Sequence, residues 1–71
     1  MKVNIEAVKQ LILERFRNNI SWFAESIGMD ATYVSTILNN PKKSKSDKFC
    51  NLLIRYCELN ELDFRNYIFL E

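Results

Sequence analysis

The sequence predicts an all-α domain built from five short helices. Its apolar residues recur at three- and four-residue spacing, which is the period of one helix face. No stretch alternates apolar and polar residues for long enough to indicate a strand. The chain has 71 residues, so we expect a single domain over residues 1–71. Apolar residues make up 48% of it, enough to form a core and to argue against disorder.

The first two helices are marked by asparagine and by short apolar stripes. Asn4 is a suitable N-cap for the first helix, which should end near Asn18 and Asn19, two poor helix formers. The second helix has either Asn19 or Ser21 as its N-cap. The apolar stripes of the two helices consist of Ile5, Val8, Ile12 and Phe16, flanked by Leu11, and of Phe23, Ala24 and Ile27.

The third helix lies between a glycine and a proline. Gly28, the one glycine of the chain, stands where a left-handed residue is needed after a helix C-terminus. Asp30 is a good N-cap, and its carboxylate favours the positive end of the next helix. That helix ends by Pro41, because the residue before a proline avoids the helical conformation. Its apolar side carries Ala31, Val34, Ile37 and Leu38.

A polar stretch over residues 42–48 precedes the last two predicted helices. Ser46 can cap the fourth helix, and a fifth helix is expected from about Asn60. The apolar residues of the fourth helix are Phe49, Leu52, Leu53, Tyr56 and Cys57, and those of the fifth are Leu62, Phe64, Tyr67, Ile68 and Leu70.

Several chemistries are excluded by the composition. The chain has no His and one Gly, so it lacks the parts of a Ser-His or Cys-His pair and of a glycine-rich phosphate loop. Cys50 and Cys57 stand two helical turns apart, roughly 10 Å along a helix axis, and cannot bridge there. We expect them to be buried thiols, and the alternative is a redox or metal role between chains. The sequence predicts neither an enzyme nor a cofactor or metal site.

The cellular location is also an expectation from composition. No apolar run approaches the roughly 18 residues that a membrane span requires. The first ten residues, MKVNIEAVKQ, break their apolar positions with polar ones, unlike a signal peptide. We therefore expect a cytoplasmic protein with no membrane partner.

The segment 20–40, ISWFAESIGMDATYVSTILNN, fits a helix-turn-helix. Ala24 is small enough for a helix crossing, Gly28 suits the turn, and Val34 and Ile37 can pack the second helix on the first. At this spacing the sequence resembles the lambdoid phage repressor and Cro family. The resemblance implies a five-helix, lambda repressor-like DNA-binding domain and a small transcriptional regulator of phage or mobile-element type. Such a protein binds double-stranded DNA, as a homodimer, with helix 30–40 in the major groove.

Candidate base contacts follow from this resemblance and from the helix face. In the family, base contacts come from the first two residues of the third helix and one about a turn later, here Ala31, Thr32 and Thr36. Asn39 points away from the apolar side, and Ser35 lies on its flank. Thr and Ser suit base edges or a thymine methyl, and Asn suits adenine. The alternative is that these side chains only solvate the helix.

Charge is distributed unevenly although the net charge is only +1. Lysines follow the third helix, where the family's loop runs along the DNA backbone, whereas carboxylates gather toward the far end of the sequence. The candidate phosphate contacts are Asn19, Tyr33, Asn40, Lys42, Lys43 and Lys45.

The C-terminal segment is richer in large apolar groups than a small monomer needs. One helix cannot turn all of them inward, so we expect a homodimer or partner interface at Tyr67, Ile68, Phe69 and Leu70. An alternative function on the same fold is therefore an antirepressor or co-repressor that binds a larger repressor protein. The low net charge and the lack of Arg and Gln in the third helix favour that alternative.

Overall fold

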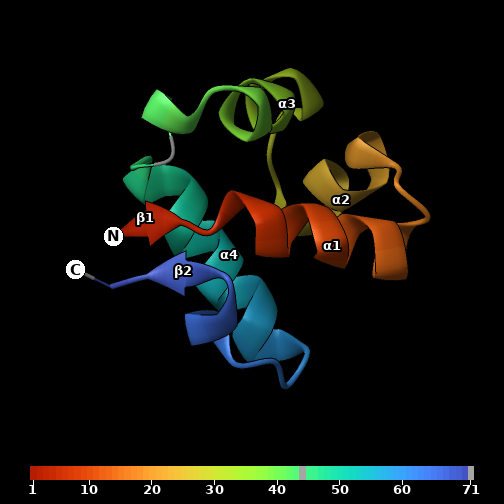
Figure 1. The fold of residues 1–71 in the computed structure, drawn as a ribbon. Coiled ribbons are helices and arrows are strands. Elements are labelled where there is room, and N and C mark those ends of the chain that lie inside the picture. Colours follow the sequence, from red (N-terminus) through yellow and green to blue (C-terminus); the bar gives the residue numbers. More distant parts are fainter. Residues whose placement is uncertain (44, 71) are drawn as a thin grey trace.

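The computed structural model describes residues 1–43 and 45–70, which are mostly helical (Figure 1). Four α-helices occupy this part of the chain, and a short strand lies at each end of it (Figure 1). The elements in order are β1 (Lys2–Val3), α1 (Ile5–Phe16), α2 (Ile20–Ile27), α3 (Ala31–Asn39), the 3₁₀ turn η1 (Pro41–Lys43), α4 (Asp47–Leu59), the 3₁₀ turn η2 (Phe64–Asn66) and β2 (Ile68–Phe69).

Side-chain caps start all four α-helices. The Asn4 side chain accepts a hydrogen bond from the Ala7 backbone N–H at 3.3 Å, as the sequence predicts. Asp30 and Ser46 cap α3 and α4, also as predicted. Asn19, rather than Ser21, caps α2, and its Oδ1 accepts from the backbone N–H of residue 22 at 3.0 Å.

Left-handed residues end the first two helices. α1 ends at Phe16, slightly before the expected position, because Arg17 and Asn18 adopt φ of 53° and 61°. Gly28 ends α2 with φ 81°, which confirms its predicted role. The next residue, Met29, donates its backbone N–H to the Ala24 carbonyl at 2.8 Å, so the chain is closed back onto α2 before α3 begins.

The core takes side chains from every α-helix and from both strands. Phe23 and Phe49 are fully buried, with ring centroids 6.4 Å apart, and Ala24 is 1% exposed. α2 and α3 pack directly on each other. The buried set is Val3, Val8, Leu11, Ile12, Phe16, Phe23, Ala24, Ile27, Val34, Ile37, Leu38, Phe49, Cys50, Leu53, Tyr56, Cys57 and Ile68.

The predicted fifth helix is wrong. After α4 the chain turns at Glu61, whose φ is 58°, and residues that were expected in a helix form η2 and β2 instead. β2 pairs antiparallel with β1, with Val3 opposite Ile68 (Figure 1). The predicted all-α class is supported, since the described chain is mostly helical. The two strands were not expected, because a two-residue strand is too short to produce a period-two pattern.

The two thiols, Cys50 and Cys57, are buried and not bonded to each other, as predicted. Burial raises the pKa of both above the ordinary thiol value. Within residues 1–43 and 45–70, none of the helices has the length and apolarity that crossing a membrane would require.

Candidate nucleic-acid interface

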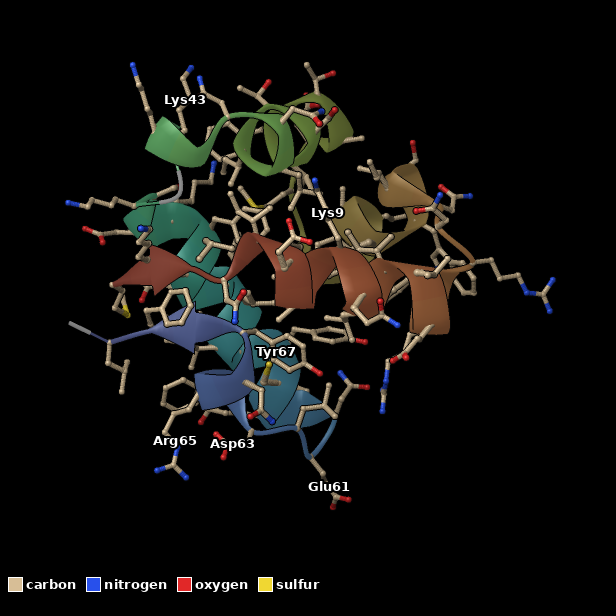
Figure 2. All side chains as sticks on the ribbon, in the orientation of Figure 1. Lys9, Lys43, Glu61, Asp63, Arg65 and Tyr67 are labelled. Atoms are coloured by element: carbon tan, nitrogen blue, oxygen red, sulfur yellow. The ribbon has the colours of Figure 1, made fainter. Side chains whose placement is uncertain are left out.

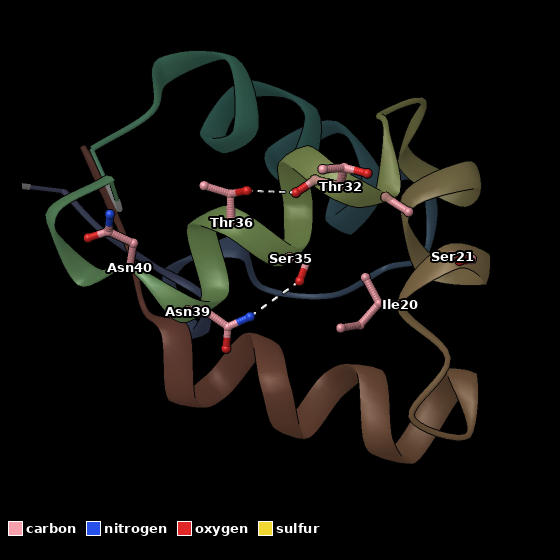
Figure 3. A pocket seen from close by; sticks show the side chains of 8 residues that line it. Ile20, Ser21, Thr32, Ser35, Thr36, Asn39 and Asn40 are labelled. Carbon is pink, nitrogen blue, oxygen red and sulfur yellow. Dashed lines mark hydrogen bonds between the residues drawn. The ribbon is translucent and has the colours of Figure 1, made fainter.

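One face of α3 is open to solvent and lined by small polar side chains. Thr32, Thr36 and Asn39 are exposed, and Ala31 and Ser35 are half-buried beside them. All five line a shallow groove that Ile20 and Ser21 border on the side of α2 (Figure 3). The opposite face holds the helix in place, because Val34, Ile37 and Leu38 are buried. The structure therefore brings the five predicted base-contact residues onto one surface.

Two hydrogen bonds order the side chains of this face (Figure 3). The Thr36 hydroxyl donates to the Thr32 carbonyl oxygen at 2.9 Å, and the Asn39 Nδ2 donates to the Ser35 Oγ at 3.2 Å. At the start of the helix, the Asp30 carboxylate accepts from the Thr32 backbone N–H at 2.7 Å. The Thr36 and Asn39 side chains thus each have a hydrogen-bond partner within α3.

Three of the predicted phosphate contacts already have partners within the protein, two of them on the backbone and one on a side chain. Asn19 caps α2, and the Asn40 side chain accepts from the Lys42 backbone N–H at 3.2 Å. The Tyr33 hydroxyl lies 2.8 Å from Ser46 Oγ, at the N-cap of α4. The Lys48 Nζ lies 5.9 Å from the centre of the Tyr33 ring, within range of a cation–π contact.

One group of lysines and one pair of acidic residues lie far apart in the molecule. Lys42, Lys43 and Lys45 are exposed, and Lys43 projects beside α3, whereas Glu61 and Asp63 lie at the far end (Figure 2). There Asp63 forms an ion pair with Arg65 at 3.1 Å. The hydrogen bonds from Arg65 lower the pKa of the Asp63 carboxyl. The lysines after α3 are therefore separated from Glu61 and Asp63 (Figure 2), whereas Asp30 lies at the start of α3 itself.

The predicted partner surface is divided between the core and the exterior. Ile68 is 2% exposed and faces the core, and Tyr67 is half-buried with a pKa that burial raises. Phe69 and Leu70 are 49% and 56% exposed. Ile68 and Phe69 differ because they form strand β2, in which successive side chains point to opposite faces. Tyr67 and Leu70 lie outside this strand.

Sequence reasoning missed the part that Ser46 and Lys48 play beside Tyr33. Ser46 was expected only as a cap, and no helical spacing relates it to Tyr33 because the two lie on different elements. As for metals, no group of three or more His, Cys, Asp or Glu side chains in the described part of the chain could hold an ion. No family model, curated protein or solved structure matches this chain.

Proposed function

We propose that the protein is a small sequence-specific transcriptional regulator that binds double-stranded DNA through a lambda repressor-like helix-turn-helix, α2 and α3. The observation that carries the proposal is the exposed face of α3, a row of small polar side chains (Figure 3) with lysines directly after the helix. An α-helix fits the major groove, and side chains of this size can approach base edges closely.

The packing of α2 and α3 supports this role. α2 and α3 are both short, they are separated by Gly28, Met29 and Asp30, and they pack on each other. In helix-turn-helix proteins the second helix is inserted in the groove while the first crosses the backbone. Here α3 buries only its apolar side, so its other side remains available for the groove.

The basic residues supply the second requirement, which is attraction to phosphate. Lys42 and Lys43 belong to η1, directly after α3, and Lys45 follows them. In the proposed complex these ammonium groups contact the DNA backbone and release counterions. Their position matters more than the net charge of +1, because the three lysines are grouped directly after α3.

We infer further that the protein acts as a homodimer. Phe69 in β2 and Leu70 directly after it have large, exposed apolar side chains, and such groups are typical of an interface. A symmetric dimer would place one α3 on each of two half-sites of a palindromic operator. This arrangement agrees with a regulator of phage or mobile-element type.

The same exposed apolar residues favour a second candidate function. An antirepressor or co-repressor on this fold would use Phe69 and Leu70, or the open face of α3, to bind a larger repressor protein. The absence of Arg, Lys and Gln from α3 agrees with this candidate, because the commonest contact to guanine is missing.

One experiment separates the two functions. Random-sequence duplexes are enriched on the full chain, and the enriched duplex and a scrambled version are then titrated at two salt concentrations. A DNA-binding regulator should prefer the enriched duplex by about 10³-fold or more. The second candidate predicts only salt-sensitive binding, in the range of about 10⁻⁴–10⁻⁶ M, that does not distinguish the duplexes. That result would overturn the main proposal.

A further inference from the structure

Two hydrogen bonds within α3, from Thr36 to the Thr32 carbonyl and from Asn39 to Ser35, leave the Thr36 and Asn39 side chains with different groups for binding. We propose that α3 reads A·T base pairs, with the Asn39 amide, positioned by Ser35, on an adenine and the Thr36 methyl group on a thymine methyl (Figure 3). This inference rests on the proposed function and names the bases that the site would recognise.

The Asn39 amide is held with its recognition atoms unoccupied by the helix. An asparagine amide has two N–H donors and one oxygen acceptor, and one N–H is bound to Ser35 Oγ at 3.2 Å. The second N–H and Oδ1 are left for an external partner, since Asn39 is exposed. One donor and one acceptor side by side match adenine, which presents N7 as acceptor and its N6 amino group as donor.

Thr36 is arranged to make an apolar contact. Its hydroxyl proton is donated to the Thr32 carbonyl oxygen at 2.9 Å, so it is not available to a base. The side chain is exposed, and its methyl group lies on the side away from that bond (Figure 3). In the major groove the apolar feature that distinguishes one base from the others is the thymine methyl.

The residue types that most often read G·C pairs are absent from α3. Guanine is read most often by Arg or Lys, and the cytosine amino group is read by Glu or Asp. The helix Ala31–Asn39 contains none of these four residue types. Asp30 precedes it, but one of its carboxylate oxygens is already bound to the Thr32 backbone N–H as the helix cap.

The adenine contact can be tested with duplexes in which each adenine of the enriched site is replaced singly by 7-deazaadenine. This base lacks the N7 acceptor and keeps the Watson–Crick edge. For the parent protein, one such replacement should weaken binding about 5- to 100-fold. Asn39→Ala should bind the adenine and the 7-deazaadenine duplex equally. Ser35→Ala should distinguish these two duplexes less than the parent does, while its affinity for scrambled DNA is unchanged. Ser26→Ala, on the exposed surface of α2, is the matched control and should behave as the parent.

The thymine contact can be tested by replacing single thymines with uracil, which removes only the methyl group. The parent should lose about fourfold in affinity at one position. Thr36→Val keeps a methyl group and should retain the preference for thymine. Thr36→Ser keeps the hydroxyl and should lose that preference.

The outcomes distinguish the inference from the proposed function. If the parent prefers one sequence but is insensitive to 7-deazaadenine and to uracil at every position, the base assignment is wrong and the DNA-binding function stands. If Ser35→Ala discriminates as well as the parent, Ser35 does not position Asn39. A parent without any sequence preference would overturn both proposals.

Discussion

The hydroxyl groups of Tyr33 and Ser46 lie 2.8 Å apart and join α3 to the first turn of α4. Ser46 Oγ also accepts the backbone N–H of Phe49 at 3.2 Å, so a single side-chain oxygen serves as helix cap and as link between two elements. α3 is thus held at the core by its apolar side and at its edge by a polar contact. A change at Ser46 should affect both helices.

Ser46→Ala should lower the free energy of unfolding by about 1 kcal/mol, because α4 loses its cap. Tyr33→Phe should cost less, about 0.5 kcal/mol, because the bond that it removes is exposed. In the Ser46→Ala background, Tyr33→Phe should cost almost nothing, since its partner is already absent. Urea denaturation measures the free energy of unfolding of the parent, the two single variants and the double variant. Fully additive costs would show that the two hydroxyl groups do not interact.

Gly28→Val should destabilise the protein by about 1–2 kcal/mol, because a β-branched residue at φ 81° is strained. An added Cβ would have no atom within 4 Å, so the cost is conformational rather than steric. Gly28→Asn is the matched control and should cost clearly less, since Asn tolerates the left-handed region. Thermal unfolding compares the variants, and equal stabilities for Val and Gly would contradict the need for a left-handed residue.

The buried thiols should make stability fall at alkaline pH. Burial raises the pKa of Cys50 and Cys57 in the folded state. The protonated thiols therefore contribute fully to the free energy of unfolding below the unfolded thiol pKa of about 8.5. This contribution is lost as the pH rises through the folded-state pKa. Replacing both residues with alanine should make the alkaline loss less steep. In the parent, both thiols should react slowly with Ellman's reagent until urea unfolds the chain, and rapid reaction in buffer would contradict their burial.

Single alanine substitutions at Lys42, Lys43 and Lys45 should weaken DNA binding to a similar extent for all sequences. Each removes one phosphate contact, so the slope of log affinity against log salt should fall by about one unit. Arg65→Ala removes a positive charge at the opposite end of the molecule and should leave the slope unchanged (Figure 2). If the triple lysine variant binds as tightly as the parent at low salt, the lysines only solvate the surface.

Phe69→Glu and Leu70→Glu should convert a dimer into monomers, because a carboxylate would be buried without a partner. Sedimentation equilibrium measures the mass, and titration with the enriched duplex should show a parallel loss of affinity as two half-sites cease to act together. Leu59→Glu, at a residue that is 75% exposed on α4, is the control and should remain dimeric. Survival of both the dimer and the affinity would show that these residues do not form the interface.

Most of the helical part of the fold could be predicted because its signals are local. A cap such as Asn4 or Ser46 bonds to a backbone N–H three residues away, so residue type and position suffice to find it. The C-terminal segment could not be predicted in this way. Ile68 is fixed by Val3 from the other end of the sequence, and pairing over such a distance overrides the local helical pattern.

The open face of α3 could be predicted from helical periodicity, which separates exposed Thr32 and Thr36 from buried Val34. The pairing of Asn39 with Ser35 also lies within reach of sequence reasoning, because the two residues are neighbours on one helix face. The contact between Tyr33 and Ser46 could not be predicted from the sequence, since it depends on how α3 and α4 pack.

The pairing of β1 with β2 closes almost the whole chain into one loop. Bringing the chain ends together costs more entropy than any local contact in the molecule, and the ladder that holds them is only two residues long on each side. This ladder should therefore form last during folding and open first in the native state. Amide hydrogen exchange should be fastest, among the hydrogen-bonded groups, at positions such as the Asn4 N–H, which donates to the Tyr67 carbonyl at 2.8 Å. Each opening would uncover Val3 and Ile68, so the lifetime of the closed ends governs how often this domain exposes its core to proteases or to other chains.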